Sequence, residues 1–270
     1  MKLTKDKVLF ELRGLSKWFG NVEVLRDLDL DIEKGRTTVI IGPSGCGKTV
    51  LLKHLIMLMR PNHGTIHFDG RRIDNLSEKK LSLVRRRFGF LFQAGALFDS
   101  QTVAENVAFA ISQHTRLSER KTTWIVREKL KMVGLEHLED RYPSELSGGQ
   151  RKRVALARAI ALEPEVILYD EPTTGLDPIR ADAINELIIK LQRELRPALD
   201  RAGRTDQPTE AVTSIAVTHD MNSAYKIADR IVMLSQGHII ADGNTEQIRA
   251  SKDERVQQFI QGRSEGLQDE

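Results

Sequence analysis

The sequence TTVIIGPSGCGKT, residues 37–49, decides the fold class of this chain. Its first five residues are all β-branched and predict a buried strand over 37–41. Three glycines follow within residues 42–47 and indicate a tight turn. Residues 48–59 are largely apolar and predict a buried helix. The order strand, glycine-rich turn, helix is typical of an α/β fold.

The rest of the chain extends this pattern. Val166–Tyr169 and Ser214–Val217 are nearly continuous apolar runs, as expected for strands of a mostly parallel sheet that is covered on both faces. Residues before Gly35, together with Gly64–Ile73, alternate apolar and polar side chains and predict a small antiparallel sheet. Residues from about 103 to 161 are mostly helical in pattern and predict a separate helical lobe.

Residues 42–49 match the pattern G-x-x-x-x-G-K-[ST] of a phosphate-binding loop (P-loop), between a predicted strand and a predicted helix. The N–H groups of such a loop and the positive end of the helix dipole form an anion site. Lys48 would reach the β- and γ-phosphates of ATP, and the Thr49 hydroxyl would bind Mg²⁺. A glycine-rich turn without a ligand is the alternative, which this context disfavours. The candidate nucleotide-binding residues of this segment are Gly42, Pro43, Ser44, Gly45, Cys46, Gly47, Lys48, Thr49 and Val50.

Two carboxylates follow the apolar strand at 166–169. Asp170 fits the Mg²⁺-binding acid of nucleotide hydrolases, and Glu171, one residue further, could orient or deprotonate the attacking water. In isolation these would be two exposed acids at a strand end. Beside a P-loop, the catalytic interpretation is the favoured one.

A second phosphate-binding surface is predicted at Leu146-Ser147-Gly148-Gly149-Gln150. Ser147 and two glycines precede a predicted helix over 151–162, so exposed N–H groups and a positive dipole end would face outward. One chain needs only one phosphate-binding surface for each ATP that it holds. The second surface therefore suggests that it serves a nucleotide held by another subunit.

The composition argues against several functions. The net charge is +3, from 41 basic and 38 acidic residues, which is too balanced to predict nucleic-acid binding. Cys46 is the only cysteine, so no internal disulfide can form and a reducing compartment fits. Residues 1–9 lack the apolar stretch of a signal peptide, and no apolar run approaches the roughly 20 residues of a membrane span. We therefore expect a protein that is soluble by itself and reaches any membrane through a partner.

Taken together with Gln93, Gly175-Leu176-Asp177 and His219, these motifs resemble an ABC transporter ATPase over residues 8–245. The resemblance implies a RecA-like P-loop NTPase core with an antiparallel β subdomain and an inserted α-helical subdomain. The implied domain is 7–245, with the helical subdomain at about 100–162, followed by a C-terminal helix and tail over 246–270. It also implies ATP and Mg²⁺ as cofactors and a head-to-tail homodimer with two ATP molecules in the interface.

The resemblance also implies the role of single residues. Gln93 would sense Mg²⁺ and the attacking water, and His219 would hold the γ-phosphate. Phe19 would stack on adenine in a position where the family usually has Tyr, with neighbouring Trp18 the less favoured candidate. Taken alone, Gln93 could be a polar loop residue, His219 a structural histidine and Phe19 a core residue. The residues that would act across the dimer are Ser147, Gly148, Gly149 and Gln150, with Asp177 in the loop that links the two sites.

The string Gln93-Ala94-Gly95-Ala96-Leu97-Phe98 is similar to the ATPases of MCE-type lipid transport systems, the Mla phospholipid-trafficking group. Pro143–Glu145, Asp177–Ile179 and Asp253–Ile260 are similar too. This resemblance implies integral permease subunits, an MCE-domain lipid-binding protein, and a peripheral location on the cytoplasmic face of the inner membrane. A long polar loop at 200–209 departs from that group.

Three alternatives remain open from the sequence. ATPases of polar amino-acid importers share much of the same background. ABC ATPases of DNA repair usually carry coiled-coil or zinc-cysteine insertions, and those of translation usually carry two cassettes, neither of which this sequence contains. A subunit that does not hydrolyse ATP is the third alternative, although all hallmark residues are present.

Overall fold

The computed structural model describes residues 7–195 and 211–263, so the predicted loop 200–209 and residues 264–270 of the predicted tail lie outside it. The chain divides into two compact units, which are described separately. The P-loop unit comprises Met1–Glu33, Thr37–Leu76 and Val217–Glu270, and the signature unit comprises Lys34–Arg36 and Ser77–Ala216.

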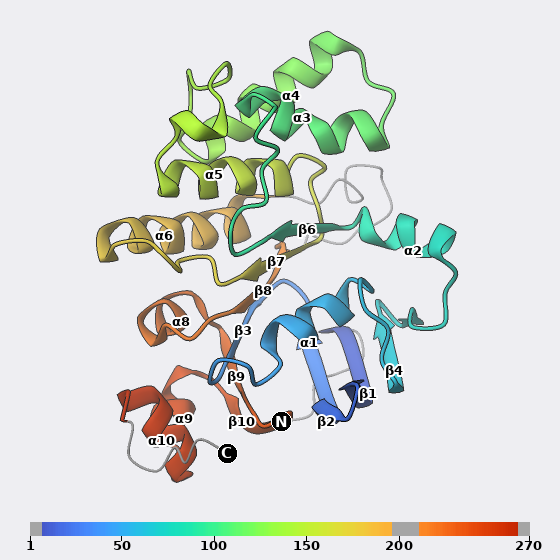
Figure 1. The fold of residues 1–270 in the computed structure, drawn as a ribbon, viewed down its shortest axis with the longest axis vertical. Coiled ribbons are helices and arrows are strands. Elements are labelled where there is room, and N and C mark those ends of the chain that lie inside the picture. The colour runs from blue at the N-terminus through green and yellow to red at the C-terminus, as the bar shows by residue number, and fades with distance from the viewer. Residues whose placement is uncertain (1–6, 196–210, 264–270) are drawn as a thin grey trace. The chain divides into compact units, whose positions relative to one another are not determined.

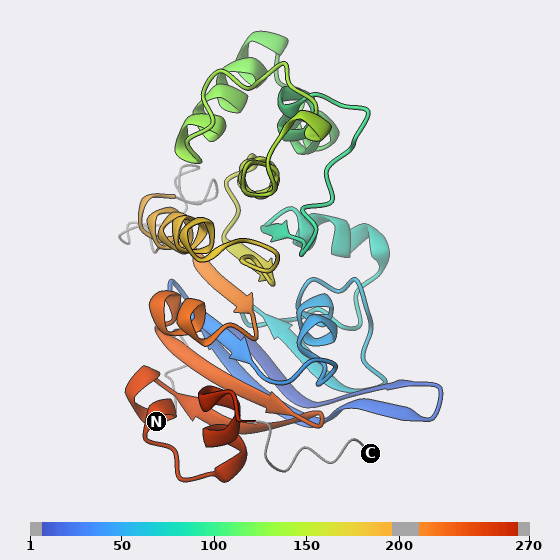
Figure 2. The same ribbon diagram turned by 60° about the vertical axis from the view of Figure 1, so that its left-hand side comes forward.

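An antiparallel sheet forms one part of the P-loop unit. Strands β1 and β2 make a long hairpin, blue in Figure 2, in which Leu12 opposes Leu30. On its other edge β1 pairs with β4, so that Phe10 opposes Phe68, and the two rings lie 4.9 Å apart. The apolar side of the alternating pattern is buried, as the sequence predicts. The sheet has the order β2-β1-β4-β5, from β1 (Val8–Phe19), β2 (Val22–Glu33), β4 (His63–Phe68) and β5 (Arg71–Arg72).

The other part of this unit contains the predicted strand 37–41. Strand β3 (Thr37–Ile41) is buried at every residue and lies parallel to β9 (Arg230–Ser235), which pairs antiparallel with β10 (His238–Gly243). The helix after β3 ends earlier than its apolar pattern predicts, at Leu55, and Met57 then takes a positive φ of 53°. The unit's helices are α1 (Lys48–Leu55), α8 (Met221–Ile227), α9 (Thr245–Arg249) and α10 (Glu254–Gln261).

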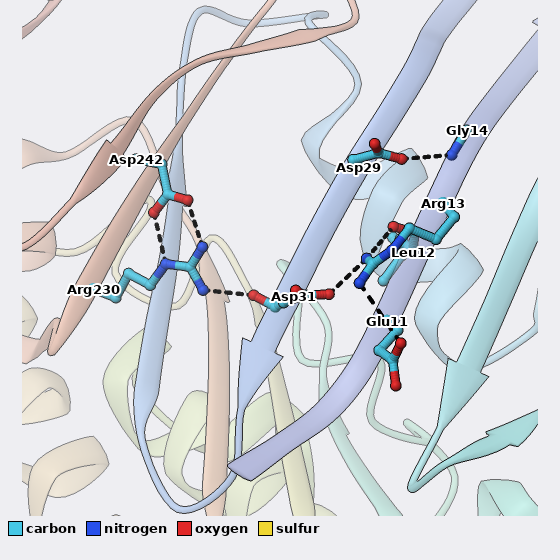
Figure 3. A network of polar contacts seen from close by, with 8 residues as sticks. All are labelled: Glu11, Leu12, Arg13, Gly14, Asp29, Asp31, Arg230 and Asp242. Carbon is cyan, nitrogen blue, oxygen red and sulfur yellow. Dashed lines mark hydrogen bonds and ion pairs between the residues drawn. The ribbon is translucent and has the colours of Figure 1, made fainter. Parts of the chain in front are cut away.

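A polar network joins the strands of the P-loop unit (Figure 3). The guanidinium of Arg230 on β9 donates to both carboxylate oxygens of Asp242 on β10 and to the carbonyl of Asp31 on β2. The Asp31 carboxylate in turn forms an ion pair with Arg13 on β1, at 2.6 Å. Hydrogen bonding to Asp242 raises the pKa of Arg230, against the effect of its burial. Arg230 thus connects β9 with β10 and β2, and the Asp31 carboxylate extends the network to β1.

The signature unit contains two parallel strands, β6 (Phe88–Leu91) and β7 (Val166–Asp170), with residues 213–216 of β8 (Thr213–Val217) next to β7. Helices α3, α4 and α5 contact one another in pairs and form the predicted helical region (Figure 1). The unit's helices are α2 (Glu78–Arg85), α3 (Val103–His114), α4 (Glu119–Met132), a short 3₁₀ helix (Pro143–Glu145), α5 (Gly148–Ala159) and α6 (Pro178–Glu194).

Helix α5 packs closely against β6. A side chain at Gly89 would bring a Cβ to 2.5 Å from the carbonyl oxygen of Ala159, so only glycine permits this approach. Val154 and Leu156 of α5 are fully buried. Among the described residues, no helix is both long and apolar enough to cross a membrane.

We expect Arg230→Met to destabilise the protein by about 2 kcal/mol, because it removes three charge-assisted hydrogen bonds between strands. This corresponds to a fall in melting temperature of about 5 °C. The matched control is Arg255→Met, which removes an ion pair with Asp253 from a side chain that is 61% exposed. Exposed pairs contribute less than about 1 kcal/mol. Equal melting temperatures for the two variants would contradict the connecting role of Arg230.

Candidate functional site

The shape of the P-loop depends on two glycines that no other residue can replace. Gly42 has a φ of 147°, and a Cβ there would lie 2.0 Å from the carbonyl oxygen of Leu234 on β9. Gly47, with a φ of 104°, is the N-cap of α1, and a Cβ there would lie 2.9 Å from the Leu25 side chain on β2. The loop is therefore seated directly against two strands.

Lys48 is buried inside this loop, with 7% of its surface exposed. Its ammonium donates to the carbonyls of Gly42 at 2.7 Å and Pro43 at 2.8 Å. No side chain caps the N-terminus of α1, so its first N–H groups, near Thr49 and Val50, remain directed at the loop. The result is a concentration of positive charge at the start of the helix, as an anion site requires.

Cys46 is a buried member of the same loop, and Ser44 and Gly45 beside it are exposed. Burial raises the pKa of the Cys46 thiol, and the nearby charge of Lys48 only partly opposes this. The thiol therefore stays protonated at neutral pH. It acts as a small apolar residue that packs under the loop.

His219 lies in the P-loop unit as well. The N–H of the preceding residue, Thr218, donates to the carbonyl of Ile40 on β3, just before the P-loop begins. The side chain of Asp220 then accepts N–H groups from the first turn of α8 and fixes the start of that helix. The exposed His219 is thus held beside the end of β3.

The two aromatic candidates at the end of β1 differ in their surroundings. The Trp18 ring packs edge-on against His63, with centroids 5.3 Å apart. The main-chain N–H of Trp18 donates to the side chain of Asn62. Phe19 pairs with Val22 at the tip of the hairpin and is 46% exposed, with the Lys17 ammonium 5.5 Å from its ring centroid. Phe19 is thus the more exposed of the two side chains.

In the signature unit, Asp170 ends β7 and is 6% exposed. Glu171 follows in a left-handed conformation with a φ of 49° and is 8% exposed. Its carboxylate accepts a hydrogen bond from the Thr174 hydroxyl at 3.0 Å. The two acids are therefore held by main-chain and side-chain contacts at the end of a buried strand.

Ser147 is the N-cap of α5, which begins at Gly148 rather than at the predicted residue 151. Its hydroxyl accepts the N–H of Gln150, and the Gln150 side chain accepts the N–H of Ser147. Ser147 itself is exposed. This reciprocal cap explains the early start, since it satisfies N–H groups of the first turn.

The loop with Asp177 lies next to this helix start. A Cβ at Gly148 would lie 3.8 Å from the Leu176 side chain, and a Cβ at Gly149 would lie 3.8 Å from Arg180. Asp177 caps α6 by accepting the N–H of Arg180 and forms an ion pair with its side chain at 3.2 Å. The structure thus brings two distant motifs of the signature unit together.

Gln93 lies just after β6 with an exposed side chain. Its carbonyl accepts a hydrogen bond from Lys152, which the sequence argument did not single out. The helical spacing could have identified it, because Lys152 lies on the same face of α5 as the buried residues Gly149 and Leu156. Arg158 was also missed, although it bonds to the loop after Gln93.

Each unit therefore carries its own share of the candidate residues. The P-loop unit holds residues 42–50 with Phe19 and His219, and the signature unit holds Gln93, Ser147–Gln150, Asp170, Glu171 and Asp177. These features define a P-loop nucleotide-hydrolase fold with an antiparallel β subdomain and a helical signature region.

Comparison with known proteins agrees with this class. The family model described as ABC transporter matches residues 25–174. An intermembrane phospholipid transport system ATP-binding protein, MlaF, from Haemophilus influenzae is 43% identical over 96% of this chain and 92% of that protein. A probable ribonucleotide transport ATP-binding protein, mkl, from Mycobacterium leprae is 41% identical over 96% of this chain and 70% of that protein. The dimeric structure of the cassette MJ0796 bound to ADP and Pi is similar with a TM-score of 0.76 and 32% identity, over 87% of this chain and 98% of that chain.

The chain belongs to the ABC transporter family. It is an ABC-type ATP hydrolase whose activity is coupled to transport, which confirms the enzyme class expected from the sequence. The predicted fold class is confirmed as well.

The residues present fit ATP and Mg²⁺. The P-loop offers backbone N–H groups and one ammonium for phosphates, and Thr49 and Asp170 carry the hard oxygen ligands that Mg²⁺ prefers. In the part of the chain that the structure describes, no group of three or more His, Cys, Asp or Glu residues could hold a metal ion.

We expect Gly42→Ala to destabilise the protein by about 3 kcal/mol, because the new methyl group meets a main-chain carbonyl that cannot move aside. The matched control is Gly45→Ala, where φ is 78° but no atom lies within 4 Å of the added Cβ. The control should lose only about 1 kcal/mol, the cost of the left-handed conformation. Thermal unfolding of both variants without nucleotide measures the difference. A Gly42→Ala variant as stable as the control would contradict this seating of the loop.

Proposed function

We propose that this chain is the ATP-hydrolysing subunit of a complex that moves phospholipid between membranes. The ATPase part of the proposal rests on the coexistence of two phosphate-binding surfaces, the P-loop and the exposed start of α5 at Ser147. The lipid part rests on the 43% identity to MlaF over nearly the whole chain. The two parts have separate tests.

In the P-loop unit, Lys48 and the N–H groups of residues 42–49 bind the phosphates of ATP, and Thr49 holds Mg²⁺. Phe19 stacks on the adenine through its exposed ring. His219 holds the γ-phosphate and the attacking water. This assignment is supported by the position of His219 beside the end of β3.

In the signature unit, Asp170 would hold Mg²⁺ through its carboxylate, and Gln93 would contact the metal and the attacking water. Glu171 accepts a proton from that water as it attacks the γ-phosphate. The hydrogen bond from Thr174 keeps the Glu171 carboxylate in one orientation. Mg²⁺, when bound, neutralises charge that develops on the phosphate oxygens.

The start of α5 binds the ATP of a second copy of the chain. Ser147 is exposed, and the N-terminus of α5 presents N–H groups that no acidic side chain of the first turn offsets. With Gly148, Gly149 and Gln150 it would contact the γ-phosphate across a head-to-tail homodimer, and Asp177 would link the two sites. The dimeric structure of the related cassette MJ0796, bound to ADP and Pi, supports a dimer of cassettes.

Glu171→Gln is expected to lower the rate of ATP hydrolysis at least about 100-fold, because the amide cannot accept the proton of the attacking water. The affinity for ATP should stay within about threefold, since the phosphate-binding groups are unchanged. The control is Glu186→Gln, the same change on the exposed side of α6. Steady-state hydrolysis and binding of fluorescent ATP give the two quantities. Hydrolysis at the wild-type rate in Glu171→Gln would refute the assigned role.

The transported substrate is assigned from relatives and from one exposed loop. Phe92, just before the Gln93–Phe98 segment, and Phe98, at its end, are 36% and 39% exposed. Such apolar surface suits contact with a permease. The complex would contain permease subunits and an MCE-domain lipid-binding protein, with this chain at the cytoplasmic face of the inner membrane. The mkl relative, named for ribonucleotide transport, is the main competing precedent.

The test is to tag this chain, solubilise native membranes gently and identify what co-purifies. We expect a multi-span permease, an MCE-domain protein and bound phospholipid. A permease with a periplasmic binding protein and no lipid would overturn the lipid assignment, and would favour a small solute such as an amino acid or nucleotide. The ATPase assignment would survive that outcome.

A further inference from the structure

Two basic side chains of α5 bond to the main chain of the loops that carry Gln93 and Glu171. The Lys152 ammonium donates to the carbonyl of Gln93 at 3.2 Å and to the carbonyl of Glu171 at 3.1 Å. The Arg158 guanidinium donates to the carbonyls of Gly95 and Ala96, both at 2.7 Å. All of these residues belong to the signature unit.

The acceptors include two strained positions. Ala96 and Glu171 have φ values of 50° and 49°, in the left-handed region that residues with a Cβ rarely adopt. Such conformations persist only where surrounding contacts hold them. In this unit, Lys152 holds the carbonyl of Glu171 and Arg158 holds the carbonyl of Ala96.

Burial of the charged Lys152 ammonium costs desolvation free energy. The residue is 7% exposed, and burial lowers the pKa of its ammonium while the charge of Glu171 raises it. Both hydrogen bonds go to neutral carbonyls rather than to a carboxylate. An apolar side chain of similar length would fill this space without the desolvation cost, so stability alone gives little reason for a lysine here.

The far end of the Gln93 loop is anchored as well. Arg158 lies over the Phe98 ring at 5.7 Å, and Phe98 packs against Phe109 of α3 with ring centroids 4.7 Å apart. The buried side chain of Asn106 accepts the N–H of Phe98 and donates to its carbonyl. The main chain between Gln93 and Phe98 therefore has few residues without an anchoring contact, and Lys152 provides the anchor at Gln93.

We propose that Lys152 is a positioning residue for ATP hydrolysis, which ties the main chain at Gln93 and Glu171 to the signature helix α5. Lys152 does not contact nucleotide in this scheme. It lies five residues from Ser147 on one rigid helix, so movement of the helix start is passed to both loops. The inference rests on the proposed function for the roles of Gln93 and Glu171.

The test is Lys152→Met in the full chain, assayed with MgATP. We expect kcat to fall at least tenfold while KM for ATP stays within about twofold, because the P-loop is untouched and only the geometry of Gln93 and Glu171 is lost. If Lys152→Met does not fold, Lys152→Gln replaces it, because the shorter amide cannot reach both carbonyls. A rise in KM with unchanged kcat, or no change in either, would overturn the proposal.

The matched control is Lys129→Met on α4. Lys129 is equally buried, at 5% exposed, but it pairs with the Glu163 carboxylate and bonds to neither loop. We expect this variant to lose stability but to keep the wild-type kcat per folded molecule. Equal losses of kcat in both variants would show a general effect of removing a buried cation and would overturn the specific role of Lys152.

Amide hydrogen exchange provides a second readout that does not depend on hydrolysis. In Lys152→Met we expect at least tenfold faster exchange at residues 93–97 and at Thr173 and Thr174, with no such change in Lys129→Met. Unchanged exchange at these residues would overturn the anchoring itself. If wild-type protein failed to hydrolyse ATP while the exchange result held, the proposed catalytic roles would fail and the anchoring would stand.

Discussion

The fit of Gly42 against the carbonyl of Leu234 is the constraint on which the P-loop unit depends. A Cβ at that position would lie 2.0 Å from the oxygen, so the main chain can turn there only because glycine has no side chain. This turn directs the following residues back over Lys48, whose ammonium is bound by the carbonyls of Gly42 and Pro43. The concentration of positive charge at the start of α1 follows from that one close approach.

In the signature unit, cations hold main-chain positions that are not glycine. Ala96 and Glu171 both carry a Cβ and adopt left-handed conformations, and their carbonyls are held by Arg158 and Lys152 of α5. Strain of this kind is commonly found at functional sites, where the surrounding structure fixes an otherwise rare conformation. The same helix starts at the exposed Ser147, so one rigid element carries the signature and both anchors.

The local motifs were the part of the site that the sequence could predict. Residues 42–49, 146–150 and 170–171 each place their chemistry within a few consecutive positions, and the family and the ATPase activity that they indicated are confirmed. The roles of single residues, such as His219 and Gln93, stay predictions. Lys152 and Arg158 were missed because their partners lie far away in the chain, 59 residues for Gln93 and 62 for Ala96.

The sequence by itself determined the fold class, the family and the ATPase class, because these depend on residue types at short, fixed spacings. The tertiary structure decided which neighbouring residues are available. It packs Trp18 against His63 and leaves Phe19 exposed, it starts α5 at Gly148 through the Ser147 cap, and it buries Lys152 between two loops. Burial and long-range hydrogen bonds arise only when distant segments meet, so no local pattern of residues specifies them.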